Sequence, residues 1–519
     1  MKRKLLFSSL LIAGIAGSVF AQEPVDQAAV QKIRDEGLNR SKVMETAFYL
    51  TDVAGPRLAG SPGLKRAQNW AVNQLKSWGL ANAKLEPWGK FGKGWEVEKN
   101  YAAITVPYYH AIIAIPKAWT SSTNGQVKSD VVLVKADSIT DLNNYKGKLA
   151  GKIVIIDNNT KLTRSTKPDL ARYTDAELEE MAKATAQPNQ RRAMDRNSPQ
   201  FIAMQKTRAL RAAMNTFFEK ENVSLILSMA RGTDGTVFTT NGASYADTAK
   251  AALPELETSG EDYQRILRLL KAGQKVEMEA DIKTQFFTDD LQGYDVVAEI
   301  PGTDKKLKDQ VVMIGGHLDS WHGATGATDN AAGSAVMMEV MRILKAIDFK
   351  PKRTIRIALW SSEEQGLFGS RGYVLNHFGD PKTMELKPEQ AKISAYYNLD
   401  NGTGKIRGIY LQGDSSAGPV FKPWFEPFKD LGASTITIRN TGGTDHQSFD
   451  AVGIPGFQFI QDAMDYGTRT HHSNQDTYDR LSEDDLKQAA TIVASFVYNT
   501  SQRQEMIPRK ELPKAQGTN

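Results

Sequence analysis

Three mainly apolar runs of the sequence each end just before acidic or histidine side chains. The runs cover residues 311–314, 355–360 and 393–399, and runs of this kind predict buried strands of a parallel sheet. In open α/β sheets, binding sites form beyond the carboxyl ends of the strands. We therefore expect a single pocket at that edge of the sheet. The polar residues that follow the three runs are, in order, His317 and Asp319, Glu363 and Glu364, and Asp400.

The segments between these runs have the spacing of helices. After Asp329, apolar side chains recur at helical intervals from Val336 to Leu344, which predicts a helix with one buried face and places Asp329 near its amino end. Alternation of strands and helices indicates an α/β fold. We expect a mixed, largely parallel sheet flanked by helices.

The polar residues beyond the strands are of the types that hold metal ions. Histidine nitrogens and carboxylate oxygens suit zinc. Two divalent ions ~3.5 to 4 Å apart can share a water and lower its pKa, and they polarise the carbonyl that the water attacks. One carboxylate must bridge the ions, and another must stay free to transfer the proton. The sequence contains candidates for every role.

Five segments together carry a family resemblance. They are HLDS at 317–320, DNAAGSA at 329–335, SSEEQGLFGS at 361–370, NLD at 398–400 and HHSNQDT at 471–477. The set resembles the M28 family of zinc exopeptidases, which includes aminopeptidases and a carboxypeptidase Q group, over roughly residues 26–105 and 290–505. The resemblance implies a zinc-exopeptidase fold of the phosphorylase/hydrolase type.

The resemblance also implies a role for each polar residue. Glu363 would be the general base and acid, and Asp319 would orient the imidazole of His317. The peptide bond after Asp329 is often cis in this family. Two Zn²⁺ ions are implied, with His317 and Asp400 on one ion, Glu364 and His472 on the other, and Asp329 as the bridge.

Two adjacent histidines compete for one ligand position. The family pattern His-x-x-x-Asp-Thr fits when it starts at His472, so His472 is assigned to the metal. Several members have a tyrosine directly before this ligand, where it stabilises the oxyanion. This chain has His471 there, and we hypothesise that His471 takes that role as a catalytic residue.

The remaining histidines have less support. His446 follows Gly442 and Gly443, which allow close backbone approach, so both a substrate-side and a structural role stay open. His110, His322 and His377 are interpreted as structural or surface residues.

The sequence between residues 127 and 288 differs in character. Short strands at 131–134 and 152–156 flank a spacer, residues 145–151, that is similar to a protease-associated (PA) domain, and residues 160–215 suggest a helical excursion. We expect a β-rich, PA-like insert that limits access to short peptides; a purely structural domain is the alternative. The expected divisions are 1–21 signal peptide, 22–126 and 289–505 catalytic domain, 127–288 insert, and 506–519 disordered tail.

The amino terminus predicts export to the periplasm or medium. Lys2, Arg3 and Lys4 precede an apolar stretch, and cleavage is expected after Ala21. The stretch is too short for a confident membrane span, and with no cysteine in the chain a lipid anchor, disulfides and thiolate chemistry are excluded. These three basic residues contribute to a formal net charge of +5, so the mature value of +2 does not indicate nucleic-acid binding.

The sequence therefore predicts an exported exopeptidase acting on peptides or dipeptides, with an aminopeptidase favoured over a carboxypeptidase or dipeptidase. The partner is a peptide substrate, without nucleic acid or stable membrane insertion, and a homodimer is left open. The alternatives are a glutaminyl-cyclase-like acyltransferase with a single zinc, a dizinc hydrolase of non-peptide amides or esters, and a non-catalytic receptor-like homologue.

Overall fold

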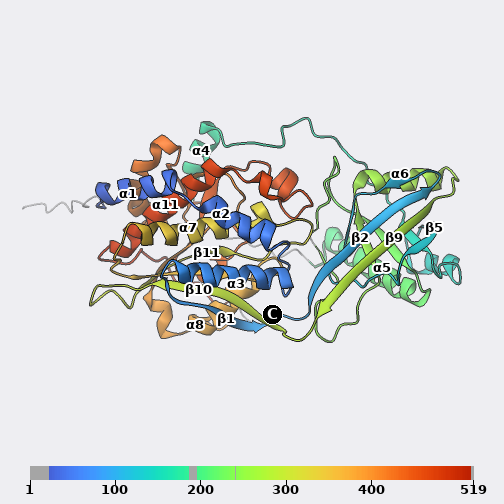
Figure 1. The fold of residues 1–519 in the computed structure, drawn as a ribbon, viewed down its shortest axis with the longest axis horizontal. Coiled ribbons are helices and arrows are strands. Elements are labelled where there is room, and N and C mark those ends of the chain that lie inside the picture. The colour runs from blue at the N-terminus through green and yellow to red at the C-terminus, as the bar shows by residue number, and fades with distance from the viewer. Residues whose placement is uncertain (1–22, 186–195, 240, 516–519) are drawn as a thin grey trace, which may run out of the picture.

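Two eight-stranded sheets organise the chain into two lobes (Figure 1). The computed structural model describes residues 23–185, 196–239 and 241–515. The first lobe holds the chain's amino-terminal helices and its carboxyl-terminal half, and the second lobe is built from the segment between them. The expected α/β class, with mixed sheets flanked by helices, is confirmed.

The first sheet is mixed, as the sequence predicts. Its strand order is β1-β10-β12-β11-β15-β18-β16-β17, and the central strands β12, β11, β15 and β18 run parallel. Strand β11 is buried on both faces because Val312 and Ile314 pack into one core and Val311 and Met313 into another. The strands are β1 (Ala81–Lys90), β10 (Gln292–Ile300), β12 (Thr354–Trp360), β11 (Val311–His317), β15 (Ile393–Asn398), β18 (Gly456–Gln461), β16 (Ile406–Tyr410) and β17 (Thr435–Thr437).

Helices cover both faces of this sheet. Helix α7 lies between β11 and the outer helices α2 and α11, so it is buried nearly all round rather than on one face. Helices α8 and α10 pack together near β1, β10 and β18. The helices of this lobe are α1 (Gln27–Asn39), α2 (Val43–Phe48), α3 (Pro62–Ser77), α7 (Ala332–Ala346), α8 (Phe368–His377), α9 (Gly418–Phe425), α10 (His446–Asp450) and α11 (Glu483–Gln502).

The second sheet begins earlier in the chain than the expected boundary at residue 127. Its order is β3-β2-β9-β5-β6-β7-β8-β4, and β2 pairs with β9 along its length, from Gly94 opposite Phe287 to Val106 opposite Glu277. The strands are β2 (Gly94–Val106), β3 (His110–Ala111), β4 (Ala114–Pro116), β5 (Val127–Val134), β6 (Ile153–Ile156), β7 (Leu225–Met229), β8 (Glu255–Thr258) and β9 (Glu277–Phe287), and the helices are α5 (Pro199–Lys220) and α6 (Gly260–Lys271).

Part of the predicted helical excursion returns to the first lobe. Helix α4 (Asp175–Ala182) packs on β17, and its Leu178 and Met181 share a core with Ile460. Arg172 forms an ion pair with the fully buried Asp462 at 2.9 Å. The insert is therefore joined to the first lobe by more than its two ends.

The prediction of a disordered tail is wrong for residues 507–510. Ile507 is buried, and the guanidinium of Arg509 donates to the carbonyls of Gln390 and Ile393 at 2.9 and 2.6 Å. Because these carbonyls lie next to the start of β15, the tail is fixed to the edge of the core.

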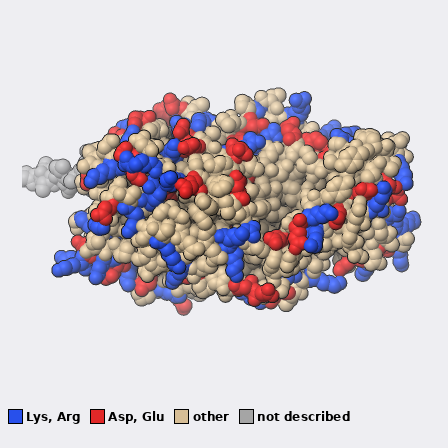
Figure 2. Space-filling view, in the orientation of Figure 1, with Lys and Arg blue, Asp and Glu red and all other residues tan. Residues whose placement is uncertain are grey.

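The surface carries charged side chains of both signs. In the face shown in Figure 2, basic and acidic side chains are interspersed and do not form a field of one sign. Among the described helices, none combines the length and apolar character that a membrane span requires. The expected signal peptide, residues 1–21, lies outside the described residues.

Candidate metal centre

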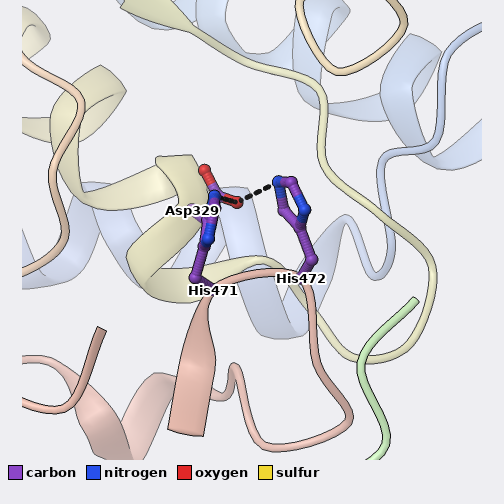
Figure 3. A group of neighbouring side chains, drawn as sticks. All are labelled: Asp329, His471 and His472. Atoms are coloured by element: carbon purple, nitrogen blue, oxygen red, sulfur yellow. Dashed lines mark ion pairs between the residues drawn. The ribbon is translucent and has the colours of Figure 1, made fainter. Parts of the chain in front are cut away.

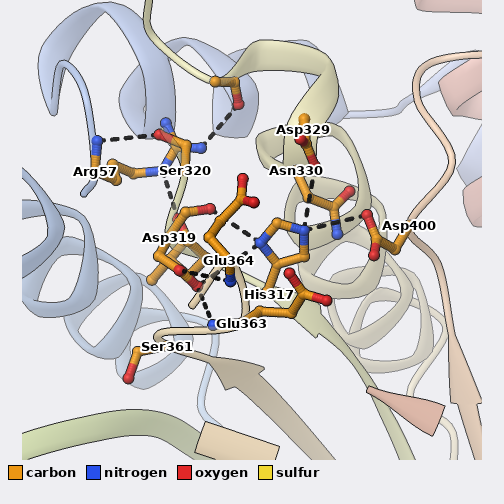
Figure 4. Close-up of polar contacts among 12 residues, drawn as sticks. Arg57, His317, Asp319, Ser320, Asp329, Asn330, Ser361, Glu363, Glu364 and Asp400 are labelled. Carbon is orange, nitrogen blue, oxygen red and sulfur yellow. Dashed lines mark hydrogen bonds and ion pairs between the residues drawn. The ribbon is translucent and has the colours of Figure 1, made fainter. Parts of the chain in front are cut away.

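The carboxyl ends of three neighbouring strands bring the predicted residues together. His317 is the last residue of β11, Glu363 and Glu364 follow β12, and Asp400 follows β15. Nε2 of His317 lies 3.1 Å from Oδ1 of Asp400 (Figure 4). The expected convergence beyond the strand ends is thus what the fold produces.

Asp329 lies between two sets of side chains. Its Oδ1 is 3.3 Å from Nε2 of His317, whereas its Oδ2 is 3.1 Å from Nε2 of His472 and 3.7 Å from Nε2 of His471 (Figure 3). Oε2 of Glu364 reaches the same nitrogen of His472 at 2.8 Å. One carboxylate therefore contacts both halves of the cluster. The peptide bond between Asp329 and Asn330 is cis, as expected.

The donor atoms of the cluster fit metal ions. Oδ2 of Asp329 and Oε1 of Glu364 are buried, and neither takes part in a hydrogen bond within the described chain. Buried carboxylate oxygens are costly unless they are hydrogen-bonded, paired or bound to a metal. His317, Asp329 and Asp400 form one group whose potential ligand atoms lie within 4.8 Å of one another, and Asp329, His471 and His472 form a second. Imidazole and carboxylate donors in two such groups suit zinc.

The charges of the cluster are strongly coupled. Burial raises the pKa of Glu363 well above its usual value, although His317 opposes the shift. Burial likewise raises the pKa of Glu364 to about 7. Burial opposes the charge of His472, but Glu364 and Asp329 outweigh it and raise the pKa of His472 to about 11. Protons thus occupy the groups that a cation would otherwise neutralise.

Asp319 acts differently from the expectation. Nδ1 of His317 donates to the backbone carbonyl of Asp319 at 3.0 Å, whereas the nearer carboxylate oxygen is 3.7 Å away. The carboxylate instead accepts the backbone N–H groups of Glu363 and Glu364 at 3.1 and 3.3 Å (Figure 4). Asp319 therefore fixes the histidine through its main chain and the glutamate pair through its side chain.

Asp476 supports the cluster, although in the sequence it served only to align the His-x-x-x-Asp-Thr pattern on His472. Its carboxylate accepts the backbone N–H groups of Thr328 at 2.6 Å and Asp329 at 3.1 Å. Burial raises the pKa of Asp476 to about 7, and the charge of Asp329 adds to the shift. The position of Asp476 in the His-x-x-x-Asp-Thr pattern was the signal that could have identified this role.

Two further residues hold the loops around the cluster. Arg57 is fully buried, and its guanidinium donates to four backbone carbonyls: those of Leu50, Leu318, Thr325 and Gly326. The hydroxyl of Tyr466 donates to Oδ1 of Asp329 at 3.0 Å, and its ring lies 4.6 Å from that of His471. Nothing in the spacing of the sequence pointed to Tyr466.

The other histidines have partners within the protein. His446 is buried, with Nε2 at 3.0 Å from the side-chain nitrogen of Gln412 and 3.2 Å from the carbonyl of Thr441. These contacts favour the structural interpretation of His446. The other partners are Asp262 for His110, the carbonyl of Pro116 for His322, and Glu86 for His377.

Two hollows differ in their relation to the cluster. A narrow one is lined by Trp321, Asp329 and His472. A larger cavity of about 430 Å³, bordered by Phe91 and Tyr294 among others, contains none of the candidate ligands. The size of the second cavity therefore does not identify it as the reactive site.

Comparison with known proteins agrees with this geometry. Residues 295–497 match peptidase family M28. The chain is 26% identical to Carboxypeptidase Q of Rattus norvegicus over 514 residues, which cover 95% of this chain and 96% of that one.

Solved structures give the same picture. A Peptidase M28 precursor from Shewanella amazonensis SB2B superimposes with a TM-score of 0.65 at 25% identity, covering 94% of this chain and 99% of that one. BSAP, a zinc aminopeptidase from Bacillus subtilis, shares the fold with a TM-score of 0.54 at 18% identity, over 90% of this chain and 96% of its own. Residues 295–497 therefore correspond to a domain of peptidase family M28.

Proposed function

We propose that the protein is an exported zinc exopeptidase that hydrolyses the terminal bonds of peptides or dipeptides. The position of Asp329 carries the proposal, because its two oxygens face two separate groups of histidine and carboxylate ligands. A bridging carboxylate of this kind is what a pair of neighbouring cations requires.

The contacts support a proposed set of ligands for two ions. Zn²⁺ ions held there would lower the pKa of a bound water and polarise the substrate carbonyl. The relationship of BSAP, described as a zinc aminopeptidase, supports zinc as the metal. One ion would be held by His317 and Asp400, the other by Glu364 and His472, and Asp329 would serve both.

Glu363 is the proposed general base. It is 8% exposed, and Asp319 fixes its backbone, so its carboxylate is held next to the cluster. Burial raises its pKa, which suits a group that accepts a proton from the attacking water and delivers it to the departing amine. Glu363 would thus serve in turn as base and as acid.

His471 is the proposed donor to the oxyanion. Burial lowers the pKa of His471, so the ring is neutral near pH 7 and can donate one hydrogen bond. Its Nε2 lies 3.7 Å from Oδ2 of Asp329, so the ring borders the proposed metal centre. A donor preorganised there stabilises the charge that develops in the transition state.

The end of the peptide that is cleaved has two candidates. The aminopeptidase interpretation from the sequence has a structural counterpart in BSAP. The carboxypeptidase interpretation is favoured by the Carboxypeptidase Q relative, which matches nearly the whole chain. Both use the same metal set and differ in how the charged terminus is held.

The products of cleavage test the function and the end preference together. Free, N-acetylated and C-amidated peptides would be incubated with the zinc-loaded protein, with and without chelator, and analysed by mass spectrometry. We expect stepwise loss of single residues that the chelator stops. Acetylation of the amino terminus abolishes cleavage by an aminopeptidase, and amidation of the carboxyl terminus abolishes cleavage by a carboxypeptidase. A dipeptidase requires both ends to be free.

Other outcomes would favour the alternatives. Loss of ammonia from an amino-terminal glutamine without peptide cleavage, with one zinc per chain, would indicate a cyclase-like acyltransferase. Turnover of non-peptide amides or esters alone would indicate that class of hydrolase. Binding of peptides without turnover would indicate a receptor-like protein.

Export would be tested by fractionating cells and sequencing the mature amino terminus, which we expect at Gln22. Sedimentation would decide whether the protein is a homodimer.

A further inference from the structure

Residues 231–239 of the second lobe contact the turn that carries His471 and His472. The backbone N–H of Thr239 donates to the carbonyl of His472 at 2.7 Å. The backbone N–H of Val237 donates to Oδ1 of Asn474 at 2.8 Å, and the backbone N–H of Asn474 donates to the carbonyl of Val237 at 3.1 Å. Phe238 thereby pairs with Ser473 as an isolated antiparallel bridge. The backbone of a candidate metal ligand is thus hydrogen-bonded to the other lobe.

Arg469 holds the preceding part of the same turn. Its Nη1 donates to the carbonyl of Thr233 at 3.0 Å and to the hydroxyl of Thr236 at 2.9 Å. Its Nη2 pairs with Asp169 at 2.8 Å and Asp234 at 3.1 Å. Three of these partners, Thr233, Thr236 and Asp234, belong to residues 231–239, so this segment contacts the turn both before and after His471 and His472.

The turn depends on such outside contacts. His472 has a φ of 61°, in the left-handed region that residues with a side chain rarely adopt. Such conformations persist when the surrounding structure enforces them. Since the carbonyl of His472 is the atom that accepts from Thr239, the contact acts on the residue whose side chain faces Glu364 and Asp329.

The other half of the centre is positioned by contacts within the first lobe. His317 and Asp400 follow adjacent parallel strands of the first sheet, and Nδ1 of His317 is fixed by Asp319 within the same lobe. We propose that the second lobe positions His472, so that metal affinity at the His472–Glu364 half depends on this junction and affinity at the His317–Asp400 half does not. Arg469 and Asn474 are then positioning residues. The inference rests on the proposed two-metal site.

Titration of metal into variants of the full-length protein tests the inference. Asn474→Ala removes the acceptor for Val237 and the donor to Gly235, and Arg469→Gln removes the ion pairs with Asp169 and Asp234. Arg34→Gln is the matched control, because it removes an ion pair and a carbonyl contact within the first lobe, to Asp430 and Pro427. Metal-free protein would be titrated with Zn²⁺ against a competing chelator, and thermal unfolding would be recorded for each variant.

The expected result is selective. Supporting contacts of metal ligands change metal affinity by about 10- to 100-fold. Both variants should therefore bind one equivalent of Zn²⁺ as tightly as the parent protein does. They should bind the second equivalent about 10- to 100-fold more weakly. Asn474→Asp, which keeps the acceptor for Val237, should recover part of the loss, and Arg34→Gln should leave both affinities unchanged. Unchanged affinities in Asn474→Ala and Arg469→Gln, or an equal loss of both equivalents, would overturn the inference. A parent protein that binds fewer than two equivalents would instead contradict the proposed function.

Discussion

The two halves of the metal centre are built in different ways. His317 and Asp400 extend from neighbouring strands of one sheet, and the side chain of His317 is 1% exposed. His472 lies on a turn outside the sheet, and its side chain is 19% exposed. Its carbonyl accepts a hydrogen bond from the backbone N–H of Thr239 in the second lobe. One half is thus fixed by secondary structure and the other by the docking of a distant segment.

The carboxylate of Asp329 connects the two halves of the metal centre. Asp329 precedes α7 in the first lobe, but its backbone N–H is held by Asp476, which lies four residues beyond His472. A displacement of the turn would therefore move both the second histidine and the support of the bridge. The sheet alone therefore does not complete the site.

Asp329→Asn should have the largest effect, since it changes the one residue that both halves share. Replacing the carboxylate by an amide removes the anionic oxygen that faces His317 or His472. We expect loss of both zinc equivalents and of peptide hydrolysis, measured by elemental analysis and by product formation. Retention of one equivalent at the parent's affinity would show that the halves are independent of the bridge.

Glu363→Gln should abolish most turnover while leaving both halves loaded. The general base contributes about 10²- to 10⁴-fold to the rate, and the amide cannot accept the proton. We expect kcat to fall by that factor with two zinc equivalents still bound. If zinc content fell instead, Glu363 would be a ligand; retained activity would remove it from the mechanism.

His471→Ala tests which of the adjacent histidines belongs to the metal. Loss of a single oxyanion donor costs about 10²- to 10³-fold in kcat, so we expect a decrease of that order in kcat/KM with both zinc equivalents retained. His472→Ala, the matched variant, should lose one equivalent. The reverse pattern would exchange the roles of the two residues, and an unchanged kcat/KM in His471→Ala would exclude it as the donor.

The residues at the strand ends could be predicted from the sequence for a physical reason. Strands buried on both faces are continuously apolar, and the residues directly after them meet at one edge of the sheet. His317, Glu364 and Asp400 were therefore identified without any long-range information. The same reasoning, joined to the motif pattern, gave the fold class and the family.

The contributions of the second lobe could not be predicted in this way. Gly94 pairs with Phe287 across nearly the whole insert, and the bond from Thr239 to His472 is made by backbone atoms, which leave no pattern in the side chains. Arg509 was misjudged for a related reason. Its partners are backbone carbonyls, so a polar tail rich in Lys and Pro resembled a disordered one.

The smallest expected effect is on the stability of the metal-free protein, which should fall as the pH rises from about 6.5 to 8. In the folded protein Glu364 and Asp476 have pKa values of about 7, above their ordinary 4.5 and 3.8, and that of His472 rises from 6.5 to about 11. The folded state thus holds protons that the unfolded chain has released, and stability falls with pH wherever that is so. Opposite shifts, those of His322 and His446 to about 4, act below pH 6.5.

Zinc should remove this decline, because the metal replaces the protons on its ligands and its binding releases them. The midpoint of thermal unfolding would be measured across this pH range for chelator-treated and zinc-loaded protein. Groups far from the cluster, such as Glu257 with its pKa of about 8, contribute equally to both forms and cancel in the difference. The gap between the two midpoints should widen with pH. Parallel curves would mean that the groups of the His472 half that titrate in this range are not the groups that bind the metal. The pH dependence of stability would then be unrelated to the role of these residues as ligands.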